Sequence, residues 1–480
     1  MSASDPNTTL SDYCGYAGLP PFADLGSVEE IQKKGLTVQQ SVARLLRLHW
    51  TLRRLHGIFN AHIAAMPIYE LKMAFSLHAL YCADYTGEIA TRVREMRQPP
   101  YELDVCPHPA LDQFLDEILG APDTASLVAG LYGVAVPAVT AALERLIEDT
   151  NRLFDHPTYR VSRHALLEME DVAAYGEKAV AALAANLDEE TKRWVGSLHS
   201  LLEIAGGLTG EQPMRDAVVA RHFSRTPFHY DPTPRRDERF QDVYNMGVNA
   251  EAMLFDPAIA PRPKTLMLYF KRMREIDVPE VIASILAETP GKPWDYYRDM
   301  TRQMWDEARH AMMGEAGFLS LGIDWKKIPF NITWSLGLNT KLSALDRHAV
   351  LFTIEQGLMP KKTGKEFEWE VAVATADPLT EVIQDYDWAD EILHARIGRD
   401  WLVPEFGSMQ ATLERGDAVW STILVDWKHW QDEGLTEHRN WWAPVYLEAC
   451  KHWDVAPDPG LLAYDITYQN IRADMKQVTA

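Results

Sequence analysis

Two five-residue segments of the chain repeat one pattern of charged residues, Asp-Glu-x-x-His. The first occupies residues 306–310 and the second residues 390–394, and apolar residues at helical spacing surround both. Residues three apart lie on one face of a helix. Each segment is therefore expected to direct a carboxylate and an imidazole at one point, Glu307 with His310 and Glu391 with His394. Two such faces can share two metal ions, so the repeat predicts a two-metal centre.

Both pairs are expected to face the protein interior. In the helix predicted for residues 294–321, Glu307 continues an apolar stripe that includes Met300 and Met304. The helix predicted for residues 379–401 repeats this arrangement around Glu391. Burying a carboxylate costs several kcal/mol, as an order of magnitude, unless a positive charge meets it. A metal ion would supply that charge.

A bundle site of this kind needs two more carboxylates from neighbouring helices. Glu355, on a helix predicted for residues 342–358, is the candidate that precedes the second motif. Before the first motif we favour Glu275, because the midpoint between it and Glu307 falls in a Pro-Gly turn; Glu280 is the rival and Glu251 a more distant third. Pro279 weakens both leading candidates, because a new helix could begin there and leave Glu275 outside it.

Charge counting favours this ligand set. Four carboxylates and two neutral imidazoles carry four negative charges, which two divalent ions cancel. Oxygen and nitrogen ligands suit iron or manganese, and the choice between two irons and a mixed pair stays open. Asp306 and Asp390 are predicted to accept the distal N–H of each histidine, and Arg309 is expected to contact one of these aspartates. His348 could be an extra ligand, although a core histidine is the more common finding.

The remaining sequence predicts an all-α protein, because apolar residues recur at helical spacing almost everywhere and alternating runs are short. Proline and glycine separate the helical segments, as in bundles with short connections. We expect an N-terminal helical bundle at 1–205 that carries no Glu-x-x-His and binds no metal, and a linker at 206–239. A di-metal bundle with a tryptophan-rich C-terminal extension is expected at 240–480. Some helices of the two halves are predicted to begin with similar short sequences, which favours two tandem bundles.

Composition excludes several classes of protein. The net charge of −22, from 47 basic and 69 acidic residues, disfavours nucleic acid as a partner. Neither a long apolar span nor a signal sequence is recognised, so a cytoplasmic protein without a membrane segment is expected. Four cysteines without paired spacing disfavour disulfides and thiolate metal sites. A homodimer is left open as an alternative to a monomer.

The two motifs, together with Glu355 and with Glu275 or Glu280, resemble the ferritin-like di-iron carboxylate proteins. This superfamily includes ribonucleotide reductase small subunits, bacterial multicomponent monooxygenases, acyl-carrier desaturases and arylamine N-oxygenases. The resemblance covers residues 264–401, and it departs from the family at Pro279 and in a long loop expected at 361–376. It implies two tandem ferritin-like four-helix bundles, the second carrying the dinuclear site.

The resemblance also implies an activity. The chain would be an oxidoreductase that activates dioxygen at two iron ions and hydroxylates, desaturates or N-oxygenates a small organic substrate. The catalytic residues it implies are the ligands Glu307, His310, Glu355, Glu391 and His394. No nucleotide, flavin or iron-sulfur motif is recognised, so an external electron donor is expected. The alternatives are a ferritin-type iron-binding ferroxidase and a non-catalytic helical scaffold that bound metal only stabilises.

Overall fold

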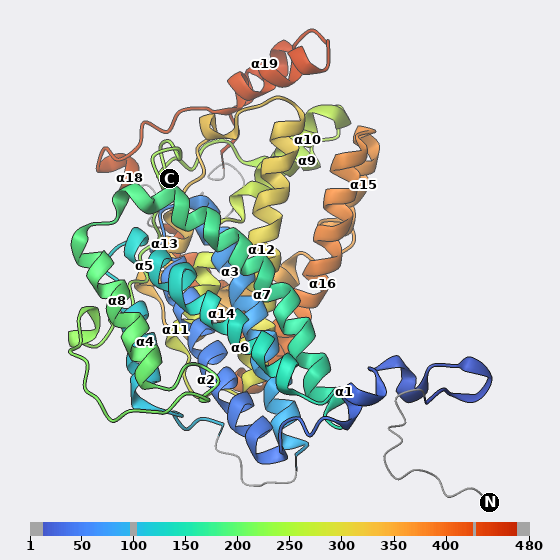
Figure 1. Cartoon of the computed structure of the whole chain (residues 1–480). Coiled ribbons are helices and arrows are strands. Elements are labelled where there is room, and N and C mark those ends of the chain that lie inside the picture. Colours follow the sequence, from blue (N-terminus) through green and yellow to red (C-terminus); the bar gives the residue numbers. More distant parts are fainter. Residues whose placement is uncertain (1–12, 97–102, 426–428, 468–480) are drawn as a thin grey trace, which may run out of the picture. The chain divides into compact units, whose positions relative to one another are not determined.

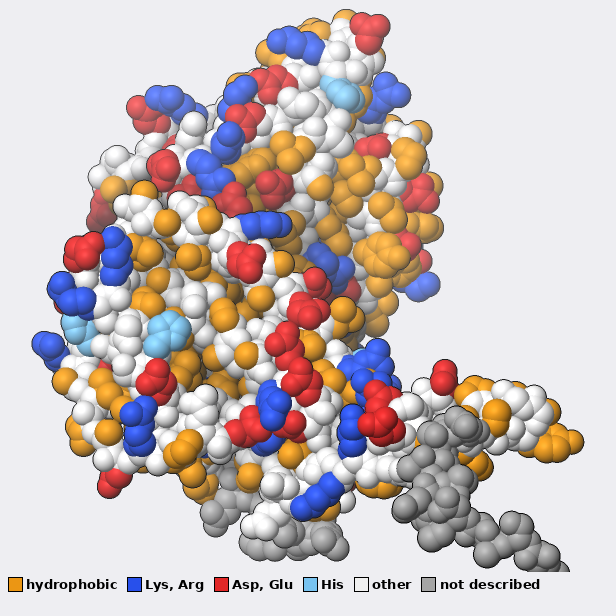
Figure 2. All heavy atoms as spheres, in the orientation of Figure 1, with side chains coloured by type: hydrophobic (Ala, Val, Ile, Leu, Met, Phe, Trp, Pro, Cys, Tyr) orange, Lys and Arg blue, Asp and Glu red, His pale blue; other side chains and the backbone are white. Residues whose placement is uncertain are grey.

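The structure is a computed structural model, and it describes residues 13–96, 103–425 and 429–467 (Figure 1). The prediction of an all-α protein is confirmed within these residues, where the only β-type pairing is an isolated bridge between Val248 and Thr467. On the face drawn in Figure 2, acidic and basic side chains are interspersed.

Contacts divide the chain into two compact units. The first comprises Met1–Ile58 and Tyr81–His229, and the second Phe59–Leu80 and Tyr230–Ala480. The division at residue 229 falls within the segment expected to be a linker, but residues 59–80 group with the C-terminal unit rather than with the N-terminal one. The reason is local packing, since Tyr69 and Met73 are buried in the core of the second unit.

In the first unit, side-chain caps set where several helices begin; Asp123, Asp155 and Asp188 each accept a hydrogen bond from a backbone N–H three residues ahead. One stretch, Thr124–Asp149, is apolar and long enough to cross a membrane, but 72% of an apolar 18-residue window within it is buried inside the protein, as in a core helix. The helices of this unit are α1 (Val28–Gln32), α4 (Pro109–Leu119), α5 (Thr124–Gly130), α6 (Val136–Asp149), α7 (His156–Leu183) and α8 (Glu189–Ile204).

Two helices contribute to both units, α2 (Val38–Ile63) and α3 (Tyr69–Arg94). The second unit adds α9 (Ala250–Phe255), α10 (Pro261–Arg274), α11 (Asp277–Glu288), α12 (Trp294–Ser320), α13 (Thr333–Lys341), α14 (Ala344–Gly357), α15 (Lys365–Thr375), α16 (Pro378–Phe406), α17 (Met409–Val425), α18 (His429–Asp432), α19 (Trp442–His452) and α20 (Pro459–Leu462).

Four helices of the second unit pack around one centre. Helix α10 packs on α12, α12 on α16, and α14 on α16, while α15 contacts both α10 and α16. Glycine permits the close approach of α12 to α10. A Cβ at Gly314 of α12 would lie 2.3 Å from the backbone nitrogen of Met273 in α10. Helix α12 thus lies directly against the end of α10.

Two features near the centre differ from the sequence expectation. The long loop expected at 361–376 contains a helix, α15, whose buried face carries Val371 and Ala372 together with the charged residues Lys365 and Glu368. Pro279 is accommodated in the first turn of α11, where its missing N–H costs nothing. The tryptophan-rich extension is also part of this core, because the Trp441 ring stacks on Phe270 at 4.3 Å.

Candidate metal centre

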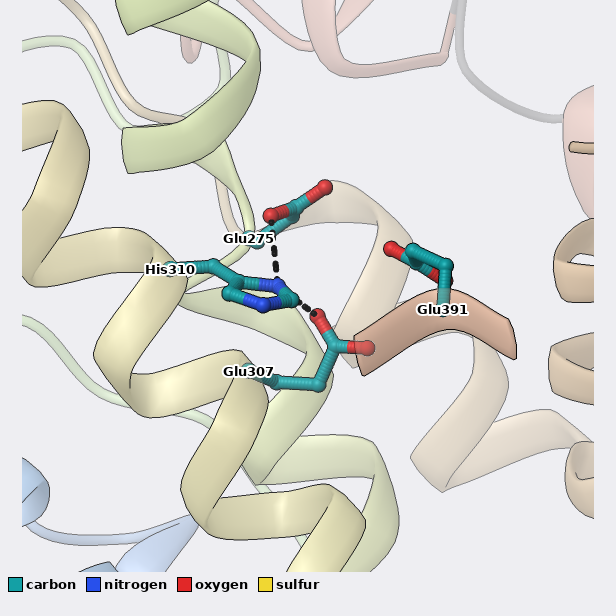
Figure 3. Close-up of side chains that lie close together, drawn as sticks. All are labelled: Glu275, Glu307, His310 and Glu391. Atoms are coloured by element: carbon teal, nitrogen blue, oxygen red, sulfur yellow. Dashed lines mark ion pairs between the residues drawn. The ribbon is translucent and has the colours of Figure 1, made fainter. Parts of the chain in front are cut away.

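Six side chains of the second unit meet at one place and form two overlapping groups. In each group, four ligand atoms lie within 4.8 Å of one another. Glu307 and Glu391 belong to both groups. The first group adds Glu275 and His310, the second adds Glu355 and His394. Each group could hold a metal ion, the two groups share two carboxylates, and Figure 3 shows the residues of the first group.

The six side chains come from four parts of the bundle. Helices α12 and α16 each supply a Glu and a His three residues apart, so both side chains leave the same face. Helix α14 supplies Glu355. Glu275 lies at the C-cap of α10, just before the chain turns into α11. As the proline suggested, a new helix does begin after Glu275, yet this carboxylate still reaches the centre.

The donor atoms fit metal ions because their hydrogen-bonding capacity is unused. Five of the six residues have a buried side-chain atom that makes no hydrogen bond within the described part of the chain. Such atoms are rare in folded proteins and call for a specific explanation. A pair of cations would satisfy all of them. The atoms are Glu275 Oε2, Glu355 Oε2, Glu391 Oε2, His310 Nδ1 and His394 Nδ1.

The histidines are oriented by aspartates of the opposite motif. His310 Nδ1 lies 3.4 Å from Glu275 Oε2, while its Nε2 lies 3.1 Å from Asp390 Oδ2. For His394 the Nδ1 lies 3.1 Å from Glu307 Oε1, and the Nε2 lies 3.4 Å from Asp306 Oδ2. Both expected aspartates thus contact histidine nitrogens, but crosswise between α12 and α16. Each Nδ1 faces the carboxylates.

Arg309 ties the two aspartates together. Its guanidinium lies 2.6 Å from Asp306 Oδ1 and 2.7 Å from Asp390 Oδ2, so it contacts both aspartates rather than one. Arg302 adds a contact of 2.9 Å to Asp306. Burial opposes ionisation of Asp306, but its contacts with His394 and these arginines lower its pKa to about 2. Asp306 therefore stays charged and can accept a proton from His394.

In the absence of metal, the carboxylates draw protons onto the histidines. Burial disfavours a charged imidazole, but contacts with Asp390, Glu275 and Glu307 outweigh it and raise the pKa of His310 to about 10. His394 behaves alike, and its pKa also lies well above the usual range. A buried site that binds protons this strongly is a site that attracts cations.

The two terminal carboxylates differ. Burial raises the pKa of Glu355, and the nearby charges of Glu391 and Glu307 raise it further. Its hydrogen-bond donor is the amide of Gln303, at 3.2 Å. Burial acts on Glu275 in the same direction, yet Arg272 and Lys365 reverse the effect and lower its pKa to about 2. Glu275, found only in the first group, therefore has cations beside it, whereas Glu355, found only in the second, has an amide.

The structure places Glu275, and not its rival Glu280, among the candidate metal ligands. It is fully buried and forms ion pairs with Lys72 and Arg236, and Ser335 Oγ donates a hydrogen bond to it at 2.8 Å. Lys72 comes from the start of α3, more than two hundred residues away in sequence. Glu280 is thus neutralised by protein cations and does not join the ligand groups. The side chain of Glu251 lies outside the described residues.

His348 is not a ligand in this arrangement. It is buried, and its Nδ1 lies 3.5 Å from the hydroxyl of Tyr296 rather than near the carboxylates. Burial, together with the charge of Lys292, lowers the pKa of His348 to about 3. It is therefore a neutral core histidine.

Sequence reasoning missed three charged neighbours of the centre. Asp387 precedes Glu391 by four residues and His394 by seven, so helical spacing could have placed it on the same face. Arg272 and Lys365 carry no such signal, because one lies near the end of α10 and the other begins the helix that was taken for a loop.

A cavity of about 470 Å³ adjoins the cluster. The carboxylates Glu275, Glu307, Glu355 and Glu391 line one part of it, and exposed residues such as Gly357 and Asp417 show that it reaches the surface. Aromatic and apolar side chains line the rest, among them Trp334, Trp420, Val350, Leu351 and Ile354. The space is of the size that holds small organic ligands.

Comparison with family models, with curated proteins and with solved structures finds no significant match to this chain.

Proposed function

We propose that the chain is a non-haem di-iron oxidoreductase that uses dioxygen to oxidise a small organic substrate by hydroxylation, desaturation or N-oxygenation. The observation that carries the proposal is the pair of ligand groups that share Glu307 and Glu391. A single metal needs no shared carboxylates, whereas two adjacent ions do. The ferritin-like arrangement of α10, α12, α14 and α16 belongs to the same proposal.

The chain's own residues have distinct tasks in this reaction. Two iron ions, when bound, supply the redox chemistry for dioxygen. Glu275 and His310 would hold one ion and Glu355 and His394 the other, while the shared glutamates keep the ions adjacent. Asp306 and Asp390 orient the histidines by accepting their distal protons. Mixed manganese and iron would satisfy the same donors.

The cavity supports an organic substrate. It brings an apolar wall, with the Trp334 and Trp420 rings 5.9 Å apart, to the same space as the four carboxylates. Apolar walls bind an organic molecule and limit water beside the reacting atoms. Incorporating one oxygen atom from dioxygen and releasing the other as water needs two electrons and two protons. We assign the electrons to an external donor.

Metal content and oxygen consumption test the proposal. Full-length protein loaded anaerobically with Fe²⁺ is expected to bind two irons per chain and to consume oxygen when a reductant is present. Glu307→Ala and Glu391→Ala should each lose both irons, because each removes a shared ligand. Glu168→Ala, which changes a glutamate of the first unit outside the cluster, is the matched control. Two irons retained in both cluster variants would exclude this centre.

The ferritin-type alternative is favoured by the same ligand set, since iron oxidation needs no organic substrate. The two activities differ in stoichiometry. A ferroxidase continues to take up iron well beyond two per chain and forms a mineral core in a large assembly. Size-exclusion chromatography after stepwise iron addition separates them, because the proposed oxidase stays at two irons per chain.

A further inference from the structure

The two metal positions differ in the charges that surround them. The Arg272 guanidinium lies 2.8 Å from Glu275 Oε1, and Lys365 Nζ lies 2.8 Å from Glu391 Oε1 and 3.7 Å from Glu275 Oε1. Both cations are buried, with side chains that are 0% and 1% exposed. They contact one ligand that belongs to the first position alone and one that both positions share.

Nearby acids do not fully cancel this positive charge. Lys365 also contacts Asp387 at 2.8 Å, and Arg272 pairs with the same carboxylate. Glu368 contacts Arg272 at 3.8 Å and also pairs with Lys271. Three cations therefore face two acids beside the first position, which leaves a surplus of one positive charge.

The second position has fewer such neighbours, because Lys365 contacts only its shared ligand, Glu391. Among the described residues, no cation forms an ion pair with Glu355, whose donor is the neutral amide of Gln303. Behind the two histidines, Arg309 contacts Asp306 and Asp390 alike. Arg302 lies closer to Asp306, at 2.9 Å, than to Asp390, at 3.9 Å, but its side chain is half-exposed and solvent screens its charge. Arg272 and Lys365 are thus the groups that make the positions unequal.

We propose that the centre binds two divalent ions with unequal affinity, the Glu355 and His394 position first, and that Lys365 is the residue that weakens the Glu275 and His310 position. The inference rests on the two-metal centre proposed above. A dication entering the first position approaches the ammonium that touches two of its four ligands, and charges interact strongly at this distance when they are buried. At limiting metal, the chain then carries one ion and lacks the pair that dioxygen chemistry needs.

Anaerobic titration of metal-free, full-length protein with Mn²⁺ tests this inference without any enzymatic assay. Calorimetry is expected to show two steps whose dissociation constants differ by about tenfold or more. Electron paramagnetic resonance should show an isolated-ion spectrum at one equivalent and a coupled-pair spectrum near two. Equal affinities, or coupled pairs dominating at one equivalent, would overturn the inference.

Variants assign the two steps to residues. Glu275→Gln should abolish the weak step alone, and Glu355→Gln the tight step. Lys365→Met should strengthen the weak step by about tenfold, with the tight step changed by less than about threefold. Lys365→Arg, which keeps the charge, should retain the inequality. The control is Lys361→Met, because the Lys361 side chain is 83% exposed and pairs with Glu366 rather than with a ligand.

The outcomes separate this inference from the proposed function. Circular dichroism shows whether Lys365→Met folds. If it does not, the Mn²⁺ titrations of the wild-type protein and of Glu275→Gln still decide whether the two sites have unequal affinities. Two equal Mn²⁺ sites would refute only the inequality. Unequal sites without iron-dependent oxygen consumption would refute the oxidase and leave the inequality standing. A chain that binds neither Mn²⁺ nor Fe²⁺ would refute both.

Discussion

A helix pair in each unit shows two ways of building an interface. Helix α6 packs on α7 through neutral side chains, among them Val139, Leu143, Met169 and Val172. Helix α12 packs on α16 through charged and titratable ones, among them Asp306, Glu307, His310, Glu391 and His394. The apolar interface is complete by itself. The charged interface needs cations, from the protein or from solution.

Two buried histidines, one in each unit, show the same difference between a neutral and a charged environment. Burial and the charge of Arg53 lower the pKa of His56 in the first unit to about 3. His310 in the second unit is equally inaccessible, yet its carboxylate neighbours raise its pKa to about 10. Burial alone therefore does not decide protonation. The charges around the ring do.

The largest expected effect comes from placing a carboxylate in the neutral interface. Met169→Glu should lower the free energy of unfolding by about 3–5 kcal/mol, because the buried residues of α6 and α7 include no cation that could pair with the new carboxylate. Urea unfolding measures the loss. Met169→Leu, which keeps volume and polarity, should cost less than about 1.5 kcal/mol. If Met169→Glu stays within about 1 kcal/mol of wild type, the contrast between the two interfaces is wrong.

The part of the centre that sequence could predict is the part that local geometry determines. Residues three apart on a helix must share a face, so the pairs of α12 and α16 were readable, and so was Glu355 on the helix predicted before the second motif. The choice between Glu275 and Glu280 was not. It depends on a break between α10 and α11, and on Lys72, which neutralises Glu280 from a remote segment.

Lys365 and Arg272 lay beyond sequence reasoning for a related reason. A basic residue in a polar stretch of sequence is ordinarily exposed to solvent. Lys365 is buried only because α15 packs against α10 and α16. The all-α class was easier, because helical periodicity recurs along the whole chain. The division into units was only partly readable, since residues 59–80 continue helices of one unit into the other.

A second prediction concerns how closely the helices approach. Gly314→Ala should cost about 3 kcal/mol, because the new Cβ would lie 2.3 Å from backbone of α10 that cannot move aside. Gly176→Ala in α7 should cost less, because it meets the side chain of Tyr132 at 2.7 Å. Gly196→Ala meets nothing within 4 Å and should stabilise by about 0.5–1 kcal/mol. Thermal unfolding of the three variants tests this order.

Metal should stabilise one helix pair and not the other. At a free Mn²⁺ concentration of 100 times the dissociation constant, a site that exists only in the folded state adds about 2.7 kcal/mol. Hydrogen exchange is expected to slow in α12 and α16 and to stay unchanged in α6 and α7, and a chelator should reverse the effect. Equal slowing in both pairs would mean that metal acts elsewhere or on the whole chain.

The smallest expected effect is the pH dependence of the stability that His56 contributes to the first unit. Because the folded pKa of His56 is lowered to about 3, its neutral form is favoured in the folded state. Its contribution is therefore fully present above the unfolded pKa of about 6.5 and is lost as pH falls from there towards 3. Between pH 7 and 5 this amounts to about 2 kcal/mol. His56→Gln should flatten the acid side of the stability curve by that amount, whereas His164→Gln, at an exposed position of α7, should not change it. An unaltered acid slope in His56→Gln would show that other groups govern the acid stability of the first unit.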